Sequence, residues 1–259
     1  MARTVAIIQA RMGSTRLPGK ILKPILGEPM LVRMLERVRR AKKLDAIVVA
    51  TTDAREDDAT AELAKASGVP VFRGSEKDVL DRFYKAAKEA RADVVIRLTG
   101  DCPLMDPSVI DRVVEYFEEA HGAIDYCGTP RNYPEGLDTE IFTFAALEEA
   151  AREAKLPSER EHVTPYIKNH PERFTYDSWQ EGQGDHSSMH WSVDTQADFE
   201  FVTAVFEQLY PKYPSFNKDD VLSLLARRPE LLSINKGGTG YEGLAKSLRE
   251  DESFKKNSA

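Results

Sequence analysis

Residues 5–20 of the chain read VAIIQARMGSTRLPGK. The apolar run at 5–8 predicts a short buried strand, which leads directly into a basic loop interrupted by glycine. Gly13 and Gly19 allow backbone conformations and close approaches that a Cβ would block, while Ser14 and Thr15 add hydroxyls and spare N–H donors. A loop of this composition can wrap a polyphosphate.

Three cations lie within this loop, at Arg11, Arg16 and Lys20. Charge-assisted hydrogen bonds from Arg and Lys are strong phosphate contacts. The alternative is that the loop is ordinary solvated surface. Its spacing is neither the P-loop pattern nor the dinucleotide fingerprint, so neither motif accounts for it.

Composition limits the possible classes of protein. A chain of 259 residues, 41% hydrophobic, can bury a substantial core as one large domain. The net charge of −7 argues against a broad nucleic-acid surface, so phosphate binding must be local. Two distant cysteines, Cys102 and Cys127, indicate a reducing compartment and no zinc site. The apolar run at the start is too short for a signal or membrane segment, and we expect a cytoplasmic protein without a membrane partner.

Strand and helix patterns alternate over the first 120 residues, which predicts a parallel sheet with crossover helices. We expect strands at 5–8, 46–51, 69–72 and 93–98, and helices at 30–38 and 79–90. Loops at the carboxyl ends of parallel strands share one rim, where ligands bind. The basic loop, Arg73-Gly74-Ser75 and the segment after Leu98 should therefore converge.

Two aspartates are candidate metal ligands. Asp101 stands in a tight turn at a strand end, and Mg²⁺ takes hard oxygen ligands, often one or two carboxylates plus substrate phosphates. Asp101 could instead cap a turn or helix, although Asp106 is the better cap. Asp194 ends a short strand predicted at 189–195, and its alternative role is to cap the next helix, for which Thr195 is also suited.

Elsewhere the pattern predicts ordinary structure. The basic residues on and after the helix at 30–38, including Arg33 and Arg37, should form a solvated face. Helices are expected at 144–154 and, as a pair, within 199–229. Residues 255–259 are expected to be frayed.

The loop from Ile8 to Lys20 closely resembles the signature of the CMP-sugar synthetases, cytidylyltransferases that activate sialic-acid-like and octulosonic acids, and most of all their spore-coat polysaccharide (SpsF-type) branch. The resemblance is densest at 8–20, 97–104, 134–142, 159–167 and 191–199. It implies a three-layer α/β/α, nucleotide-diphospho-sugar transferase-like (Rossmann-like) fold with a mainly parallel sheet. The implied domain covers 1–243, with a sugar-site and dimerisation region at about 123–190 and a charged tail at 244–259.

The resemblance also implies an activity: transfer of CMP from CTP to a 2-keto-3-deoxy sugar acid, with release of pyrophosphate, for surface polysaccharide synthesis by a homodimer. Catalytic roles fall to Arg11, Lys20, Asp101 and Asp194, the two aspartates holding Mg²⁺. The implied nucleotide-binding residues are Gln9, Ala10, Arg11, Gly13, Ser14, Arg16, Lys20, Arg73, Ser75, Thr99 and Gly100. The implied sugar-binding residues are Arg131, Gly136, Asp138, Glu140, Arg160 and His162, with Arg131 and Arg160 as candidates for the sugar carboxylate.

Some alternatives stay open at this point. The metal turn carries Cys102 where sialic-acid and octulosonate relatives often have an acidic residue, so the reaction class is better defined than the sugar. No pattern separates cytosine from uracil, and His162 could be catalytic, substrate-binding or structural. A nucleotide-sugar-dependent glycosyltransferase of the same fold and a non-catalytic sugar-nucleotide-binding protein are the alternative functions.

Overall fold

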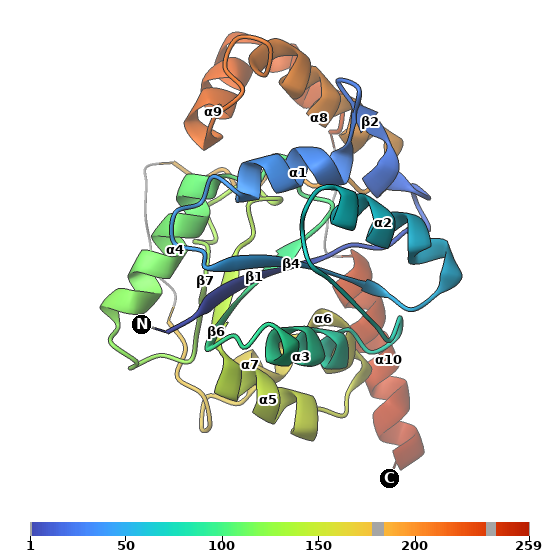
Figure 1. Ribbon diagram of the computed structural model, residues 1–259, viewed down its shortest axis with the longest axis vertical. Coiled ribbons are helices and arrows are strands. Elements are labelled where there is room, and N and C mark those ends of the chain that lie inside the picture. Colours follow the sequence, from blue (N-terminus) through green and yellow to red (C-terminus); the bar gives the residue numbers. More distant parts are fainter. Residues whose placement is uncertain (1, 178–183, 237–241, 259) are drawn as a thin grey trace.

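A six-stranded sheet forms the centre of the molecule (Figure 1). The computed structural model describes residues 2–177, 184–236 and 242–258. Along the sheet the strands run in the order β5 (Val71–Gly74), β4 (Ala46–Thr52), β1 (Thr4–Gln9), β6 (Val94–Thr99), β8 (Glu140–Thr143) and β7 (Tyr126–Gly128). A separate short ribbon pairs β2 (Pro24–Ile25) with β3 (Glu28–Pro29).

The predicted parallel sheet is confirmed. β5, β4, β1 and β6 pair in parallel, whereas β8 runs antiparallel to its neighbours β6 and β7. Of the four strands predicted in the first 120 residues, three agree with β1, β4 and β6 to within one residue at each end, whereas β5 begins and ends two residues later than the 69–72 expected from the sequence. β1 has β4 on one side and β6 on the other. After β1 the chain adds β4 and β5 on one side, and it then returns to add β6 on the opposite side of β1. The boundary between β1 and β6 is therefore a topological switch point, where α/β folds bind ligands.

Side chains of the central strands alternate between two apolar layers, as the pleat requires. Ile8 and Val49 belong to the core on one face, and Ile7 and Ala50 to the core on the other. The first core is covered by α1 (Met30–Val38), α2 (Asp58–Ala66) and α4 (Pro107–Glu119), and the second by α3 (Val79–Glu89), α5 (Phe144–Glu153) and α7 (Pro165–Asn169). The fold is therefore the expected three-layer α/β/α arrangement.

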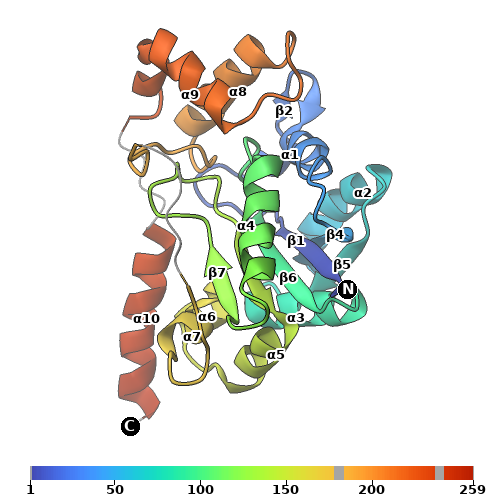
Figure 2. The same ribbon diagram turned by 90° about the vertical axis from the view of Figure 1, so that its left-hand side faces the viewer.

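Further helices flank these layers. α8 (Gln196–Leu209) and α9 (Lys218–Arg227) confirm the predicted pair and lie beyond α1 (Figure 1), and short 3₁₀ turns occur at Lys20–Leu22, Arg55–Asp57 and Pro229–Ser233. α6 (Pro157–His162) packs against α10 (Glu242–Ser258), which runs along the side of the molecule (Figure 2). A frayed end was expected at 255–259. That expectation was wrong for residues 255–258, because helix α10 continues to Ser258.

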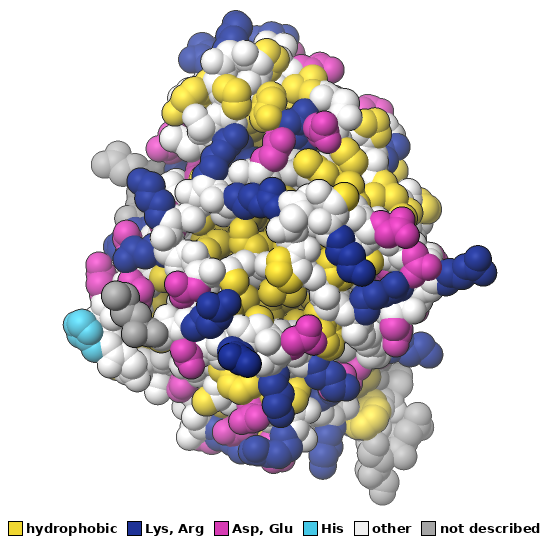
Figure 3. Space-filling model, in the orientation of Figure 1, with side chains coloured by type: hydrophobic (Ala, Val, Ile, Leu, Met, Phe, Trp, Pro, Cys, Tyr) yellow, Lys and Arg dark blue, Asp and Glu magenta, His cyan; other side chains and the backbone are white. Residues whose placement is uncertain are grey.

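The surface mixes the two signs of charge. Figure 3 shows Lys and Arg side chains interspersed with Asp and Glu over the face seen in Figure 1, rather than gathered in one area. Within the described ranges, no helix combines the length and the apolar character needed to cross a membrane.

Two arginines of α1 correct the expectation of a solvated basic face. Arg33 and Arg37 are 5% and 1% exposed. Arg37 donates from Nε to the Met105 carbonyl (2.8 Å) and from Nη2 to the Phe216 carbonyl (3.0 Å), and its guanidinium lies 4.1 Å from the centre of the Phe216 ring. Burial lowers the pKa of Arg37 to about 10. Arg37 thus ties α1 to the turn after β6 and to the segment before α9.

Replacing this arginine should destabilise the fold. Arg37→Met would leave the buried Met105 and Phe216 carbonyls without donors, and we expect the free energy of unfolding in urea to fall by about 2–4 kcal/mol. Lys42→Met, at an exposed position just after the same helix, is the control and should stay within about 0.5 kcal/mol of the parent. Equal stability of the two variants would contradict the role given to Arg37.

Candidate active site

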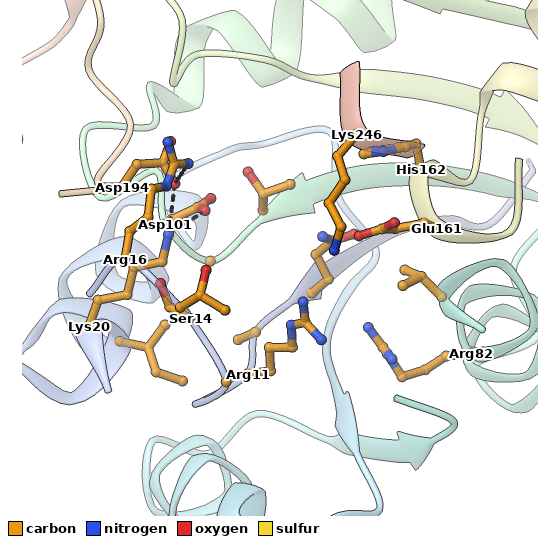
Figure 4. Close-up of a pocket in the computed structure, with 18 residues that line it drawn as sticks. Arg11, Ser14, Arg16, Lys20, Arg82, Asp101, Glu161, His162, Asp194 and Lys246 are labelled. Carbon is orange, nitrogen blue, oxygen red and sulfur yellow. Dashed lines mark hydrogen bonds and ion pairs between the residues drawn. The ribbon is translucent and has the colours of Figure 1, made fainter. Parts of the chain in front are cut away.

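A cavity of about 510 Å³ opens at the carboxyl ends of β1 and β6 (Figure 4). Its lining comes from six parts of the chain. These are the basic loop after β1, the turn after β6, the segment before α8, helices α3 and α6, and helix α10. The lining residues are Gln9, Ala10, Arg11, Gly13, Ser14, Thr15, Arg16, Lys20, Ile21, Val79, Arg82, Thr99, Gly100, Asp101, Glu161, His162, Asp194 and Lys246.

The basic loop and the turn after β6 meet through their backbones. Gln9 and Thr99 are partners in the parallel ladder, and the N–H of Gly100 donates to the Gln9 carbonyl at 2.8 Å. A Cβ on Gly100 would lie 2.9 Å from the Cβ of Ala10 and 3.0 Å from the Gln9 oxygen. Only glycine fits this approach, so the loop and the turn share one wall of the cavity.

The loop is held in shape by a buried carboxylate from another strand end. Asp57, which is fully buried, accepts a hydrogen bond from the Met12 N–H at 2.6 Å and another from the Thr52 hydroxyl. Gly19 has a φ of +68°, and its N–H donates to the Met12 carbonyl at 3.2 Å. These contacts fix the loop before any ligand arrives.

Lys20 is the centre of the cavity's charged end. Its ammonium donates to Asp101 Oδ2 at 2.8 Å, to Asp194 Oδ1 at 3.2 Å and to the Val193 carbonyl at 2.6 Å, and the residue is only 7% exposed. Burial alone would lower the pKa of Lys20, but the two carboxylates outweigh it and raise the pKa. Burial would likewise raise the pKa of Asp101, and the Lys20 charge holds it below its usual range. Lys20 and Asp101 are therefore both ionised at neutral pH.

The other two loop cations lie at different points of the cavity. Arg16 Nη2 stands 3.0 Å from Asp194 Oδ1, at the same end as Lys20. Arg11 lies nearer the middle, where its exposed guanidinium reaches Glu76 at 3.4 Å. The three predicted phosphate ligands thus line one cavity without forming a single cluster.

Asp194 is positioned by an extended segment and not by the strand predicted at 189–195. That prediction was wrong: the described backbone forms only an isolated bridge between His190 and Glu135. Val193 N–H instead donates to the Asp101 carbonyl at 2.8 Å, which joins the two aspartate segments directly. Thr195 caps α8, as expected, in a capping box with Asp198.

The segment at 134–138 packs behind the one that carries Asp194. Gly136 has a φ of +101°, and a Cβ there would lie 2.6 Å from the Ser192 nitrogen. Glu135 exchanges backbone hydrogen bonds with Met189 and Trp191, and its carboxylate accepts from His190 Nδ1 at 2.7 Å. Gly136, predicted at a sugar site, thus lies against the segment that carries Asp194, and Glu135 pairs with that segment.

His190 is a buried cation in this support. Its Nε2 lies 3.7 Å from both Asp194 Oδ2 and Asp198 Oδ2. Burial opposes its charge, but hydrogen bonds to Asp198 and Glu135 outweigh burial and raise the pKa of His190 to about 10. The imidazolium thus compensates three carboxylates beside the cavity.

Several predicted site residues lie outside the cavity lining. Arg73 pairs with Asp58, and the Ser75 hydroxyl accepts from the Asp78 N–H at the start of α3. Arg160 donates to Asp78 and to the Ala151 carbonyl. Seven of the described residues that were predicted at the site do not line the cavity: Arg73, Ser75, Arg131, Gly136, Asp138, Glu140 and Arg160.

Glu140 has a structural network of its own. It accepts hydrogen bonds from the Tyr126 hydroxyl (2.7 Å) and the Thr164 hydroxyl (2.8 Å), and it pairs with Arg97 and Lys168. Burial would raise the pKa of Glu140, but Lys168 and Arg97 hold it far below its usual range. In this structure its carboxylate joins β6, β7, β8 and the α6–α7 turn.

The structure adds cavity residues that the sequence did not indicate, among them Arg82, Glu161 and Lys246. Arg82 is 2% exposed and donates to the Ser75 carbonyl, while its Nε has no hydrogen-bond partner among the described residues. Burial, then the nearby charge of Arg11, lowers the pKa of Arg82 to about 10. Arg82 lies on the buried side of α3 with Val79 and Phe83. Helical spacing could therefore have shown that Arg82 faces the core, but not that it lines the cavity.

Cys102 follows the metal candidate Asp101 and is 2% exposed. Its sulfur lies 3.1 Å from the Thr99 hydroxyl and 3.7 Å from Asp101 Oδ1. Burial, reinforced by the Asp101 charge, raises the pKa of the Cys102 thiol well above its usual value. Cys102 and Cys127 are both free thiols.

The predicted magnesium site is compatible with this arrangement. Asp101 and Asp194 point at one cation position, which the Lys20 ammonium occupies. Among the described residues no cluster of three or more His, Cys, Asp or Glu could hold a metal ion. Two carboxylates would therefore need phosphate oxygens from a substrate to complete the coordination of Mg²⁺, which is the usual arrangement for this ion.

The cavity lies at the strand ends of an α/β fold, and it brings a basic loop together with two aspartates. This combination is typical of nucleotide-binding enzymes. The model of the cytidylyltransferase family matches residues 5–219. The spore coat polysaccharide biosynthesis protein SpsF of Bacillus subtilis is 35% identical over 231 residues, covering 86% of this chain and 94% of that protein. The chain belongs to the cytidylyltransferase family and is a nucleotidyltransferase.

Two further likenesses agree with this assignment. A solved cytidylyltransferase from Leptospira borgpetersenii superposes with a TM-score of 0.85 at 36% identity, covering 93% of this chain and all of that one. The 3-deoxy-manno-octulosonate cytidylyltransferase of Zea mays is 42% identical over 127 residues, which is 48% of this chain and 41% of that protein.

The charge on His190 gives a pH-dependent stability. Its folded pKa of about 10 lies above the unfolded value of 6.5, so its contribution is full below pH 6.5 and is lost as the pH rises toward 10. We expect the parent to be more stable than His190→Gln by on the order of 2–4 kcal/mol at pH 6, and by much less at pH 10. Urea denaturation at both pH values measures the difference.

The control for this experiment is His121→Asn, at an exposed histidine after α4. Its difference from the parent should show no such loss between pH 6 and pH 10. A stability advantage over His190→Gln that stays constant across this range would contradict a charged His190.

Proposed function

We propose that this protein transfers CMP from CTP to the anomeric hydroxyl of a 2-keto-3-deoxy sugar acid and releases pyrophosphate. The observation that carries the proposal is the convergence of Lys20, Asp101 and Asp194 at one end of a cavity walled by the basic loop. The names of the relatives support the choice of substrates, since one acts in spore coat polysaccharide biosynthesis and another is a 3-deoxy-manno-octulosonate cytidylyltransferase.

In this reaction the sugar hydroxyl attacks the α-phosphorus and loses its proton to water as the new P–O bond forms, while the bond to the β-phosphate breaks and pyrophosphate leaves. The protein is required mainly to align the reactants and to neutralise charge. Arg11 and Arg16, on the fixed loop, would bind the phosphates of CTP and the leaving pyrophosphate. Because the loop is already held by Asp57, little ordering is needed when the nucleotide binds.

Asp101 and Asp194 would hold Mg²⁺, which neutralises phosphate charge and polarises the α-phosphate. Lys20, which pairs with both carboxylates, would add its positive charge at the phosphate end of the cavity. The nucleobase would lie against the backbone near Ala10 and Gly100, where carbonyl groups can accept from an exocyclic amine. A homodimer, expected from the resemblance, remains part of the proposal.

The test is a two-dimensional substrate screen. CTP, UTP, ATP and GTP are each combined with 3-deoxy-manno-octulosonate, its 8-amino-8-deoxy analogue and N-acetylneuraminate in the presence of Mg²⁺. Pyrophosphate release and a product mass equal to sugar acid plus CMP are expected with CTP. Turnover only with a preformed nucleotide sugar and an acceptor would show a glycosyltransferase, and ligand-induced thermal stabilisation without product would show a binding protein.

Removing one carboxylate should abolish the chemistry while the fold remains. Asp101→Asn deletes a magnesium ligand but leaves Lys20 its contacts with Asp194 and Val193, so we expect kcat to fall at least about a hundredfold with an unchanged melting temperature. Asp219→Asn, at a side chain that is 77% exposed and pairs with its neighbour Lys218 outside the cavity lining, is the matched control and should keep its activity. Full Mg²⁺-dependent turnover by Asp101→Asn would exclude the assigned role.

A further inference from the structure

Helix α10 is fastened to α6 by buried polar contacts. Asp251, 4% exposed, accepts hydrogen bonds from the Ser158 N–H at 2.9 Å and from the Ser158 hydroxyl at 2.6 Å. One turn earlier the fully buried Ser247 hydroxyl donates to Glu161 Oε2 at 2.7 Å and lies 3.1 Å from His162 Nε2. Buried polar groups must find their partners, so these pairs fix the rotation and the register of α10 on α6.

This register places Lys246 in the cavity. Lys246 precedes Ser247, and it lines the cavity together with Glu161 and His162. Figure 4 shows Lys246 extending from α10 into the cavity on the side of Glu161 and His162, with Lys20, Asp101 and Asp194 at the opposite end. The cavity thus has two charged ends, one from the loop after β1 and one from the last helix.

The second end of the cavity carries one exposed cation, Lys246, beside the Glu161 carboxylate, which already accepts a hydrogen bond from Ser247. Lys246 is well exposed, and its ion pair with Glu250 is loose, with Nζ 3.8 Å from Oε1. Such a pair contributes little, so the ammonium can exchange Glu250 for another anion. Burial lowers the pKa of His162, which leaves its imidazole neutral at pH 7 as a hydrogen-bonding group beside Lys246.

The remaining cavity cations are engaged elsewhere. Lys20 and Arg16 face Asp194 at the other end of the cavity. Arg82 is buried against the Ser75 carbonyl, and Arg160, expected to bind the sugar carboxylate, is tied to Asp78 outside the cavity. Arg11 belongs to the phosphate-binding loop and is 43% exposed, against 76% for Lys246, so among the described cavity residues Lys246 offers the most accessible positive charge to an acid that enters with the nucleotide.

We propose that Lys246 of α10 binds the carboxylate of the acceptor sugar acid, and that α10 makes this enzyme selective for acidic acceptors. The inference rests on the function proposed above. With the triphosphate against the loop and the carboxylate against Lys246, the anomeric hydroxyl lies between the two ends, where it can reach the α-phosphate. His162, held by Ser247, completes the wall against which the acid binds.

The test uses Lys246→Met, which keeps the length of the side chain and removes its charge, and Lys246→Arg, which restores the charge. Lys255→Met is the control, because Lys255 lies nine residues along α10, about two and a half turns away and on the opposite side. Steady-state kinetics are measured with CTP and the best acid from the screen, and with the methyl ester of that acid. Melting temperatures confirm that each variant is folded.

We expect Lys246→Met to raise KM for the acid about tenfold, the loss of one charge-assisted hydrogen bond, with KM for CTP changed less than about twofold. Lys246→Arg should recover most of the affinity, and Lys255→Met should match the parent. The methyl ester, which lacks the negative charge, should bind the parent and Lys246→Met equally.

An unchanged KM for the acid in Lys246→Met would overturn the inference while leaving the proposed function intact. An increase for acid and ester alike would overturn it too, since the side chain would then act by shape. A large increase in Arg82→Met with none in Lys246→Met would place the carboxylate against α3 instead. Absence of turnover by the parent with every acid would instead show that the proposed function is wrong.

Discussion

The buried ammonium of Lys20 is the interaction on which the rest of the site depends. It joins two carboxylates that are 81 and 174 residues away in sequence, and it also donates a hydrogen bond to the Val193 carbonyl. Two carboxylates in so small a space repel each other unless a cation lies between them. Lys20 supplies that cation from the end of the same loop that faces the cavity, so the loop and both aspartates are assembled together.

Around this contact the structure is arranged in supporting layers. Asp57 holds the loop from the side of β4, and His190, with Glu135 and Asp198, holds Asp194 from the other side. Gly100 and Gly136 mark the two places where backbones come too close for a side chain. Residues of the 134–140 region, which resemble site residues in sequence, lie outside the lining of this cavity and against the segment that carries Asp194.

Much of the fold and the first half of the site could be predicted because their signals are local. Apolar runs marked the strands, and the order of strands and helices placed the basic loop and Asp101 at one rim. The segment at 189–195 misled because the apolar residues Trp191 and Val193 occupy alternate positions, as in a strand, although residues 190–193 are all buried and the backbone pairs with separate partners. Arg37 and Lys246 carry no local sign of their roles: each looks like one more cation on a charged helix, and only distant contacts bury the first and direct the second into the cavity.

The thiol beside the metal candidate has one more consequence. Oxidants and alkylating reagents attack the thiolate, and Cys102 is kept protonated by its apolar surroundings and by the negative charge next to it. Peroxide or iodoacetamide should therefore spare the very turn on which the reaction depends for as long as the chain stays folded.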